Sequence, residues 1–102
     1  MFAYNATKGA VSQLTKCMAL DLAKDNIRVN AICPGLVETD INRGQPYIDP
    51  IKANTPLGRV ATTHDIAKLA LFLASDASSA ITGHEHVIDG GFTAGVPVAK
   101  KD

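Results

Sequence analysis

One stretch of the chain decides its fold: Ile27-Arg28-Val29-Asn30-Ala31-Ile32-Cys33-Pro34-Gly35. Apolar side chains alternate along it with the period of two that is typical of a strand, so we predict a strand over residues 27–33. Pro34-Gly35 then ends the strand, because proline cannot donate to a ladder and glycine favours turns. Ligands of open α/β sheets bind at such carboxyl ends, and Val37 and Thr39 follow on the same loop. The alternative is a plain turn.

An amphipathic helix precedes this strand. We predict it over residues 3–24, and Asp25-Asn26 ends it because asparagine tolerates the left-handed conformation found at helix ends. Its apolar residues share one broad arc at the helical period: Ala10, Val11, Leu14, Cys17, Met18 and Leu22. Asp21 falls inside that arc and needs a polar partner if the arc is buried.

A second helix begins at Thr62-Thr63-His64-Asp65, which has the spacing of a capping box with aspartate in place of the usual Glu or Gln. Ser75-Asp76 ends this helix, and a second strand is predicted over residues 86–89. The connection of residues 36–61 is long for a compact domain and holds one short helix near Pro50–Asn54. The order helix, strand, long connection, helix, strand predicts an α/β fold with a parallel pair of strands.

The composition excludes several classes of protein. The 102 residues carry 10 basic and 10 acidic side chains, so the net charge is zero and no basic excess points to nucleic acid. No apolar run approaches the ~20 residues of a membrane-spanning helix, and no signal peptide is recognisable. Cys17 and Cys33 lack the spacing of a metal or redox motif, so we expect reduced, partly buried thiols in a cytoplasmic protein.

Three further patterns suggest ligand sites but are incomplete. His84 and His86 have no third ligand nearby, so we expect no metal site and ordinary strand or turn histidines. Gly90-Gly91 with Gly95 is not followed by a helix and is therefore not a dinucleotide fingerprint. His64 falls in the first turn of the second helix and is expected to face solvent.

Tyr4 and Lys8 are the residues best suited to chemistry. Their spacing of four places both on one face of the first helix, one turn apart. A free tyrosine has a pKa near ~10, and a nearby ammonium stabilises its phenolate, so such a pair can act as a general acid/base. Taken alone, the pair favours a plainer alternative, an amphipathic tyrosine beside a solvated lysine.

Short motifs in a fixed order carry a resemblance to a known family. They are Tyr4-Asn5-Ala6-Thr7-Lys8, the stretch 27–35, Val37-Glu38-Thr39, Pro56-Leu57-Gly58-Arg59, Leu71-Phe72-Leu73-Ala74-Ser75-Asp76, Ile81-Thr82-Gly83 and Val87-Ile88-Asp89-Gly90-Gly91. Through them the chain resembles the carboxyl-terminal part of a short-chain dehydrogenase/reductase. The resemblance implies the C-terminal portion of a single Rossmann-like domain, a doubly wound parallel sheet, over residues 1–102, with a tail at 92–102.

The resemblance also implies an activity, hydride transfer between NAD or NADP and a hydroxyl or carbonyl carbon of a small alcohol or ketone. Tyr4 would be the acid/base, and Lys8 would lower its pKa and hold the nicotinamide ribose. The residues implied to contact the cofactor are Tyr4, Lys8, Pro34, Gly35, Val37 and Thr39. The connection of residues 36–61 would be the substrate lid, most of it residues 40–58.

The family's glycine-rich turn, Gly-x-x-x-Gly-x-Gly, has no counterpart among the 102 residues, nor do its cofactor-selecting residue and its catalytic serine. We therefore expect a fragment that lacks the cofactor-binding half, is marginally stable or oligomeric, and has no appreciable dehydrogenase activity alone. The resemblance implies a homo-oligomer, dimer or tetramer, with the first helix in an interface. One alternative is a non-catalytic remnant that acts only by associating with full-length relatives, and a third is an unrelated small α/β binding module.

Overall fold

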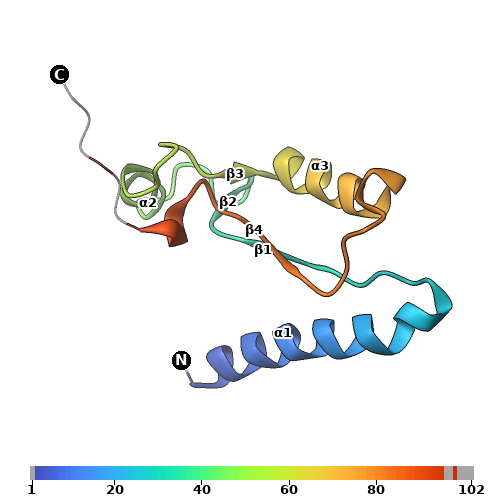
Figure 1. The fold of residues 1–102 in the computed structure, drawn as a ribbon. Coiled ribbons are helices and arrows are strands. Elements are labelled where there is room, and N and C mark those ends of the chain that lie inside the picture. Colours follow the sequence, from blue (N-terminus) through green and yellow to red (C-terminus); the bar gives the residue numbers. More distant parts are fainter. Residues whose placement is uncertain (1, 96–97, 99–102) are drawn as a thin grey trace. The chain divides into compact units, whose positions relative to one another are not determined.

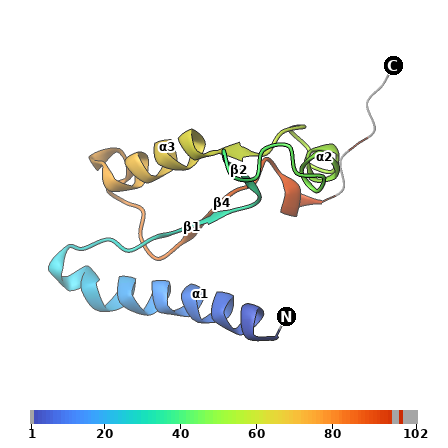
Figure 2. The same ribbon diagram turned by 180° about the vertical axis from the view of Figure 1, so that it is seen from behind.

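The computed structural model describes residues 2–95 and 98, and its ribbon is shown from opposite sides in Figures 1 and 2. The chain forms two compact units, which are described one at a time. The first comprises Met1–Ile32 and Ala70–His86, and the second comprises Cys33–Leu69 and Val87–Asp102. Among the described residues, no helix combines the length and the apolar character that a membrane crossing requires.

Helix α1 opens the first unit and spans Phe2–Leu22 (Figure 1, blue). It continues as a single 3-10 turn over Ala23–Asp25. Asn26 closes this turn in the left-handed conformation, with φ of 59°, and its N–H donates to the Ala23 carbonyl at 2.9 Å. The predicted helix and its asparagine end are therefore confirmed, for the reason given by the sequence.

The buried side of α1 is made of small residues rather than of the apolar arc. Thr15 and Ala19 are buried, and a Cβ built on Gly83 would lie 3.4 Å from the Ala19 Cβ. The arc residues Val11, Leu14 and Met18 stay 49%, 58% and 41% exposed. Small side chains allow this close approach of a turn to a helix, so the core forms beside the arc instead of on it. Asp21 is exposed and needs no buried partner.

Two strands pair in a sheet: β1 (Ala31–Pro34) and β4 (Glu85–Ile88). The N–H of Ala31 donates to the His84 carbonyl at 3.0 Å, and the N–H of Gly35 donates to the Ile88 carbonyl at 3.3 Å. The bonded partners advance in the same direction along both strands, so the pairing is parallel, as predicted.

The sequence predicted that the first strand begins at Ile27, but β1 begins at Ala31. The residues before it are extended but bond to a turn instead of to a ladder. The N–H of Val29 donates to the Thr82 hydroxyl at 3.0 Å, and the N–H of Gly83 donates to the Val29 carbonyl at 2.7 Å. A turn satisfies these backbone groups as fully as a strand would, which the alternation of side chains does not reveal.

The Arg28 guanidinium binds the carboxyl end of helix α3, which spans Thr63–Ala74. Its Nη2 donates to the carbonyls of Leu73 at 2.8 Å and Ser75 at 3.2 Å, and its Nη1 donates to the Ile81 carbonyl at 3.2 Å. The last carbonyls of a helix have no partner within it and carry partial negative charge, so a cation is favourable there. Arg28 thereby satisfies a carbonyl of the last turn of α3 together with two carbonyls that follow the helix.

The second unit contains a two-stranded sheet that the sequence did not predict. Strand β2 (Val37–Glu38) pairs in parallel with strand β3 (Ala61–Thr62). Val37 lies opposite Ala61, and Glu38 lies opposite Thr62. Strands of this length are too short to show a period of two in the sequence. The pairing holds the two ends of the 36–61 connection side by side.

Helix α2 (Ile48–Ala53) lies within this connection and confirms the short helix predicted there. The Thr55 hydroxyl donates to the Ile51 carbonyl at 2.6 Å and so satisfies one of the last carbonyls of α2. The buried residues of the second unit are Ile48, Thr55, Val60 and Ala61. The connection therefore has a small core of its own and is not an unstructured loop.

Helix α3 begins with the predicted capping box. The N–H of Asp65 donates to the Thr62 hydroxyl at 3.2 Å, and Asp65 Oδ2 accepts from the N–H of Thr62 at 2.9 Å. Each side chain satisfies a backbone donor that the first turn of the helix leaves without a partner. Aspartate thus performs the role that glutamate usually has in this motif.

Candidate functional site

Tyr4 and Lys8 both lie in α1, within the first unit. The helix places their Cα atoms one turn apart, because 3.6 residues make a turn. Lys8 is exposed, and the side chain of Tyr4 lies outside the described part of the structure. The other predicted cofactor contacts, Pro34, Gly35, Val37 and Thr39, lie in the second unit. The catalytic role of the pair stays a prediction.

Gly35 is required by the chain's own packing. A Cβ built on it would lie 2.9 Å from the Cβ of Asp89, closer than real side chains approach. The family resemblance implies that Gly35 contacts the cofactor, and the structure shows Asp89 where a side chain at position 35 would lie. The N–H of Gly35 donates to the Ile88 carbonyl, so the loop after β1 is fixed directly to the end of β4.

Asp89 organises the turn that follows β4. Its Oδ2 accepts from the Thr93 hydroxyl at 2.7 Å and the Thr93 N–H at 3.0 Å, and its Oδ1 accepts from the Gly91 N–H at 2.9 Å. The Thr93 hydroxyl, followed by these backbone N–H groups, lowers the pKa of Asp89 below its usual value despite partial burial. The sequence analysis missed this carboxylate. An Asp-Gly-Gly sequence directly after a strand was the signal for it.

Thr39 is held by Asn42, a residue that the sequence analysis did not single out. The Thr39 N–H donates to Asn42 Oδ1 at 2.7 Å, and the Asn42 N–H donates to the Thr39 hydroxyl at 3.4 Å. Asn42 Nδ2 also donates to the Val37 carbonyl at 2.9 Å. Because the Thr39 hydroxyl accepts in this arrangement, its own hydrogen can be donated to a ligand. The Thr-x-x-Asn spacing was the available signal, since it repeats the logic of a capping box.

Charged side chains surround Glu38, the neighbour of Thr39. Glu38 Oε2 lies 3.2 Å from Lys52 Nζ, and its Oε1 lies 4.0 Å from Arg43 Nε. Arg43 Nη1 also lies 3.0 Å from Asp40 Oδ1. A hollow of about 420 Å³ adjoins this cluster, and its lining residues are Glu38, Thr39, Asp40, Ile41, Arg43, Thr62 and Thr63. Thr39 therefore faces a charged, open cavity of the second unit.

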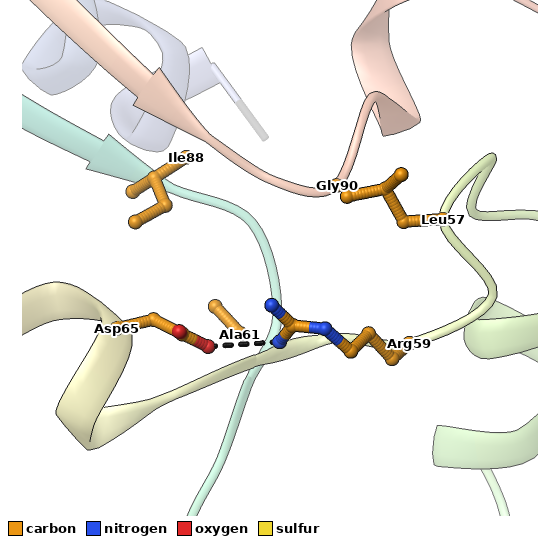
Figure 3. A pocket seen from close by; sticks show the side chains of 6 residues that line it. All are labelled: Leu57, Arg59, Ala61, Asp65, Ile88 and Gly90. Atoms are coloured by element: carbon orange, nitrogen blue, oxygen red, sulfur yellow. Dashed lines mark hydrogen bonds and ion pairs between the residues drawn. The ribbon is translucent and has the colours of Figure 1, made fainter.

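A second hollow of about 140 Å³ lies between Arg59 and the turn after β4 (Figure 3). It is lined by Leu57, Arg59, Ala61, Asp65, Ile88 and Gly90. Arg59 Nη1 donates to Asp65 Oδ2 at 2.9 Å. The Thr62 N–H and then this arginine lower the pKa of Asp65 from 3.8 to about 2. The ion pair compensates the charge of Arg59, so this guanidinium serves the structure of the second unit rather than the binding of an anion.

The histidines and cysteines form no ligand cluster in the described residues. His86 Nε2 lies 3.1 Å from Asn30 Oδ1, and His84 and His64 are exposed. Within residues 2–95 and 98, no group of three or more His, Cys, Asp or Glu side chains is placed to hold a metal ion. Cys33 is half-buried as expected, whereas Cys17 is exposed because its face of α1 is not part of the core.

The structure describes all of the predicted lid but only part of the predicted tail. Of residues 92–102, the structure describes 92–95 and 98, and the rest lie outside the described residues. Phe92–Ala94 form a 3-10 turn. All of residues 36–61 is described, with the strands and helix given above. The role of this connection as a substrate lid stays a prediction.

Comparison with known proteins gives consistent matches over most of the chain. A family model described as enoyl-(acyl carrier protein) reductase matches residues 1–93. The chain is 49% identical over 89 residues to a 3alpha-hydroxysteroid dehydrogenase of Mediterraneibacter gnavus, covering 85% of this chain and 36% of that protein. It is 44% identical over 101 residues to the uncharacterized oxidoreductase YxbG of Bacillus subtilis, covering 89% and 37%.

Solved structures agree with these matches. A short chain dehydrogenase family protein from Francisella tularensis superposes with a TM-score of 0.82 at 45% identity, covering 92% of this chain and 44% of that one. A 4-hydroxyisoleucine dehydrogenase complexed with NADH gives a TM-score of 0.82 at 41% identity, covering 91% and 40%. The chain spans between 34% and 38% of the length of the curated relatives that it matches.

Proposed function

Because this chain belongs to the short-chain dehydrogenase/reductase family, with the Rossmann-type α/β fold of that family, we propose that it carries the proton-transfer and substrate-facing part of an NAD(P)-dependent oxidoreductase. The observation that carries the proposal is the position of Tyr4 and Lys8, one turn apart on α1 and inside the matched residues 1–93. An ammonium one turn from a phenol stabilises the phenolate, which suits a group that must take and return a proton.

The roles of the residues follow from their chemistry. We propose that Tyr4 gives a proton to the oxygen of a carbonyl substrate, or takes one from an alcohol, while Lys8 stabilises the phenolate and binds the ribose hydroxyls. The nicotinamide cofactor supplies or accepts the hydride when it is bound. The substrate class is a small molecule with a hydroxyl or carbonyl group, which residues 40–58 enclose.

The donors of the second unit fit one end of such a cofactor. Thr39 has a hydroxyl hydrogen to donate, and Asn42 fixes the backbone on both sides of it. These groups suit the nicotinamide end of a dinucleotide, together with backbone groups at Pro34, Gly35 and Val37. The diphosphate needs a glycine-rich turn at a helix amino terminus, which none of the glycines in this sequence makes. We therefore propose that residues beyond these 102 complete the cofactor site.

A segment exchange tests the proposal. Residues 1–93 replace the matching segment of the Mediterraneibacter gnavus 3alpha-hydroxysteroid dehydrogenase, and oxidation or reduction of the nicotinamide is followed by its ultraviolet absorbance with that enzyme's own substrate. We expect an active chimera whose kcat falls about 10²- to 10⁴-fold on Tyr4→Phe, the usual contribution of a general acid/base. The control is Ser12→Ala, which removes a hydroxyl from the same helix about two turns beyond Tyr4 and outside the proposed lid.

Two results would contradict the proposal. One is a folded chimera, with an unchanged circular dichroism spectrum, that binds NAD(H) or NADP(H) but turns over no substrate. The other is equal activity of the Tyr4→Phe and Ser12→Ala chimeras. A parallel titration of NADH and NADPH into the 102-residue chain is expected to show weak binding or none, and tight binding would refute the need for a further cofactor-binding segment.

A second candidate function is association without catalysis. Val11, Leu14 and Met18 form an exposed apolar stripe on α1, which favours contact with another protein chain. We propose that a second copy or a full-length relative covers it, as the family resemblance implies. Sedimentation of the chain, with and without Leu14→Glu, separates this function from the first, since association requires no Tyr4.

A further inference from the structure

We propose that Glu38 is a positioning residue, an ionic latch that holds the lid segment 40–58 against the loop bearing Thr39. The inference deepens the proposed function and rests on it only for the part that Thr39 plays in binding. The latch itself is a property of the second unit, and the residues that build it are Glu38, Arg43 and Lys52.

Glu38 has a fixed backbone. It lies in β2 opposite Thr62 of β3, and its neighbour Val37 is tied to Asn42 through the Val37 carbonyl. Residues that belong to a paired strand cannot move without breaking backbone hydrogen bonds. The carboxylate of Glu38 is therefore attached to a paired strand, directly before Thr39.

The cations that meet this carboxylate come from the lid. Lys52 lies in α2, and its Nζ is 3.2 Å from Glu38 Oε2. Arg43 lies in the turn before α2, and its Nε is 4.0 Å from Glu38 Oε1. One carboxylate therefore holds residues from both flanks of the segment 43–52, which fixes the orientation of that segment as well as its distance.

Burial makes the lysine contact stronger than an ordinary surface pair. The side chain of Glu38 is 22% exposed and that of Lys52 is 32% exposed, whereas those of Arg43 and Asp40 are 65% and 92% exposed. Charges with less water around them interact more strongly and are less screened by salt. The Glu38–Lys52 pair is thus the main contact of the latch, and Arg43 supplements it.

The far end of α2 is fixed by different interactions. The N–H of Leu57 donates to the Gly90 carbonyl at 3.1 Å, and the N–H of Gly58 donates to the Thr55 carbonyl at 2.7 Å. These bonds carry no charge and do not involve Glu38. Loss of the latch should therefore free the turn at 40–47 and α2, while the segment after Thr55 keeps its bonds.

Amide hydrogen exchange of the 102-residue chain, read by mass spectrometry of peptides, tests the latch without any dinucleotide. We expect Glu38→Gln and Lys52→Gln each to speed exchange of the amides in residues 39–53 by about two- to five-fold at low salt, the range of partly exposed ion pairs. Molar salt should reduce the difference from wild type. Glu85→Gln, the same chemical change at an exposed glutamate of β4, should leave these amides unaffected.

A reversed pair separates a latch from simple structural damage. Glu38→Lys combined with Lys52→Glu, in a chain that also carries Arg43→Gln so that no cation lies beside position 38, restores opposite charges at the two main positions. Slow exchange in 39–53 should then return. The proposal is overturned if either single glutamine variant exchanges like wild type, if the reversed pair fails to restore slow exchange, or if α3 accelerates equally, which indicates general unfolding. Failure of cofactor binding in the segment-exchange experiment would leave all of these exchange results unchanged.

Discussion

Gly90 lies at a position where the second unit has no room for a side chain. Its φ is +66°, and an added Cβ would lie 2.7 Å from Thr55 Cγ2 and 3.1 Å from the Arg59 carbonyl oxygen. Alanine there adds roughly 1–2 kcal/mol for the left-handed backbone and about 1–3 kcal/mol for the overlap. We expect Gly90→Ala to lower the free energy of unfolding by about 2–5 kcal/mol, the sum of these two costs.

Gly44 provides a matched control for this prediction. Its φ is +84°, and no atom lies within 4 Å of an added Cβ, so Gly44→Ala carries the backbone cost alone. Urea unfolding of both variants, followed by circular dichroism, gives the two losses, and a stabilising osmolyte extends the folded baseline of a marginal chain. The packing argument is refuted if Gly90→Ala costs no more than Gly44→Ala at equal slope m.

The remaining predictions concern α1, the capping box and the end of α3. Gly9→Ala should raise the free energy of unfolding by about 0.5–1 kcal/mol, because Gly9 is helical with nothing within 4 Å of an added Cβ; an unchanged or lower Tm contradicts this. The pKa of Asp65 is lowered from 3.8 to about 2, so its carboxylate stabilises the fold above the higher value and loses this effect as the pH falls toward the lower one. The Tm difference between wild type and Asp65→Asn should therefore shrink between about pH 5 and pH 2, and a constant difference would refute the assignment. Arg28→Lys keeps the positive charge but loses the forked guanidinium that donates to three carbonyls. The free energy of unfolding in urea should fall by about 1.5–3 kcal/mol. Equal stability would show that the charge alone suffices.

Local signals in the sequence predicted local structure well. The box at Thr62 and Asp65 requires only that a hydroxyl and a carboxylate lie three residues apart, so the start of α3 was predictable. Asn26 likewise ends α1 through its own conformational preference. The α/β fold followed from the order of helices and strands and from the family motifs, and the comparisons confirm it.

Features that depend on distant residues escaped prediction. Ala19 of α1 is buried and lies against Gly83, a residue far along the chain, so the hydrophobicity of α1 alone did not identify its buried residues. Likewise, position 35 has room only for glycine because Asp89, a residue far along the chain, occupies the space of a side chain. The contacts of Asn42 around Thr39 are local, but an Asn three residues after a Thr is too common to be noticed without the structure.

The hydrogen bonds that join Arg28 and Asn30 to residues 73–81 enclose a large loop. Arg28 and Leu73 are 45 residues apart, and Asn30 and Ile81 are 51 apart. The entropy of closing a loop grows only with the logarithm of its length, so even doubling the enclosed segment costs about 0.6 kcal/mol. The loop-closure cost of lengthening an exposed turn between these anchors is therefore small, provided that the buried residues Ile48, Thr55, Val60 and Ala61 keep their places. The proposed lid, residues 40–58, lies inside this loop, so we expect its exposed turns to tolerate changes in length at little entropic cost.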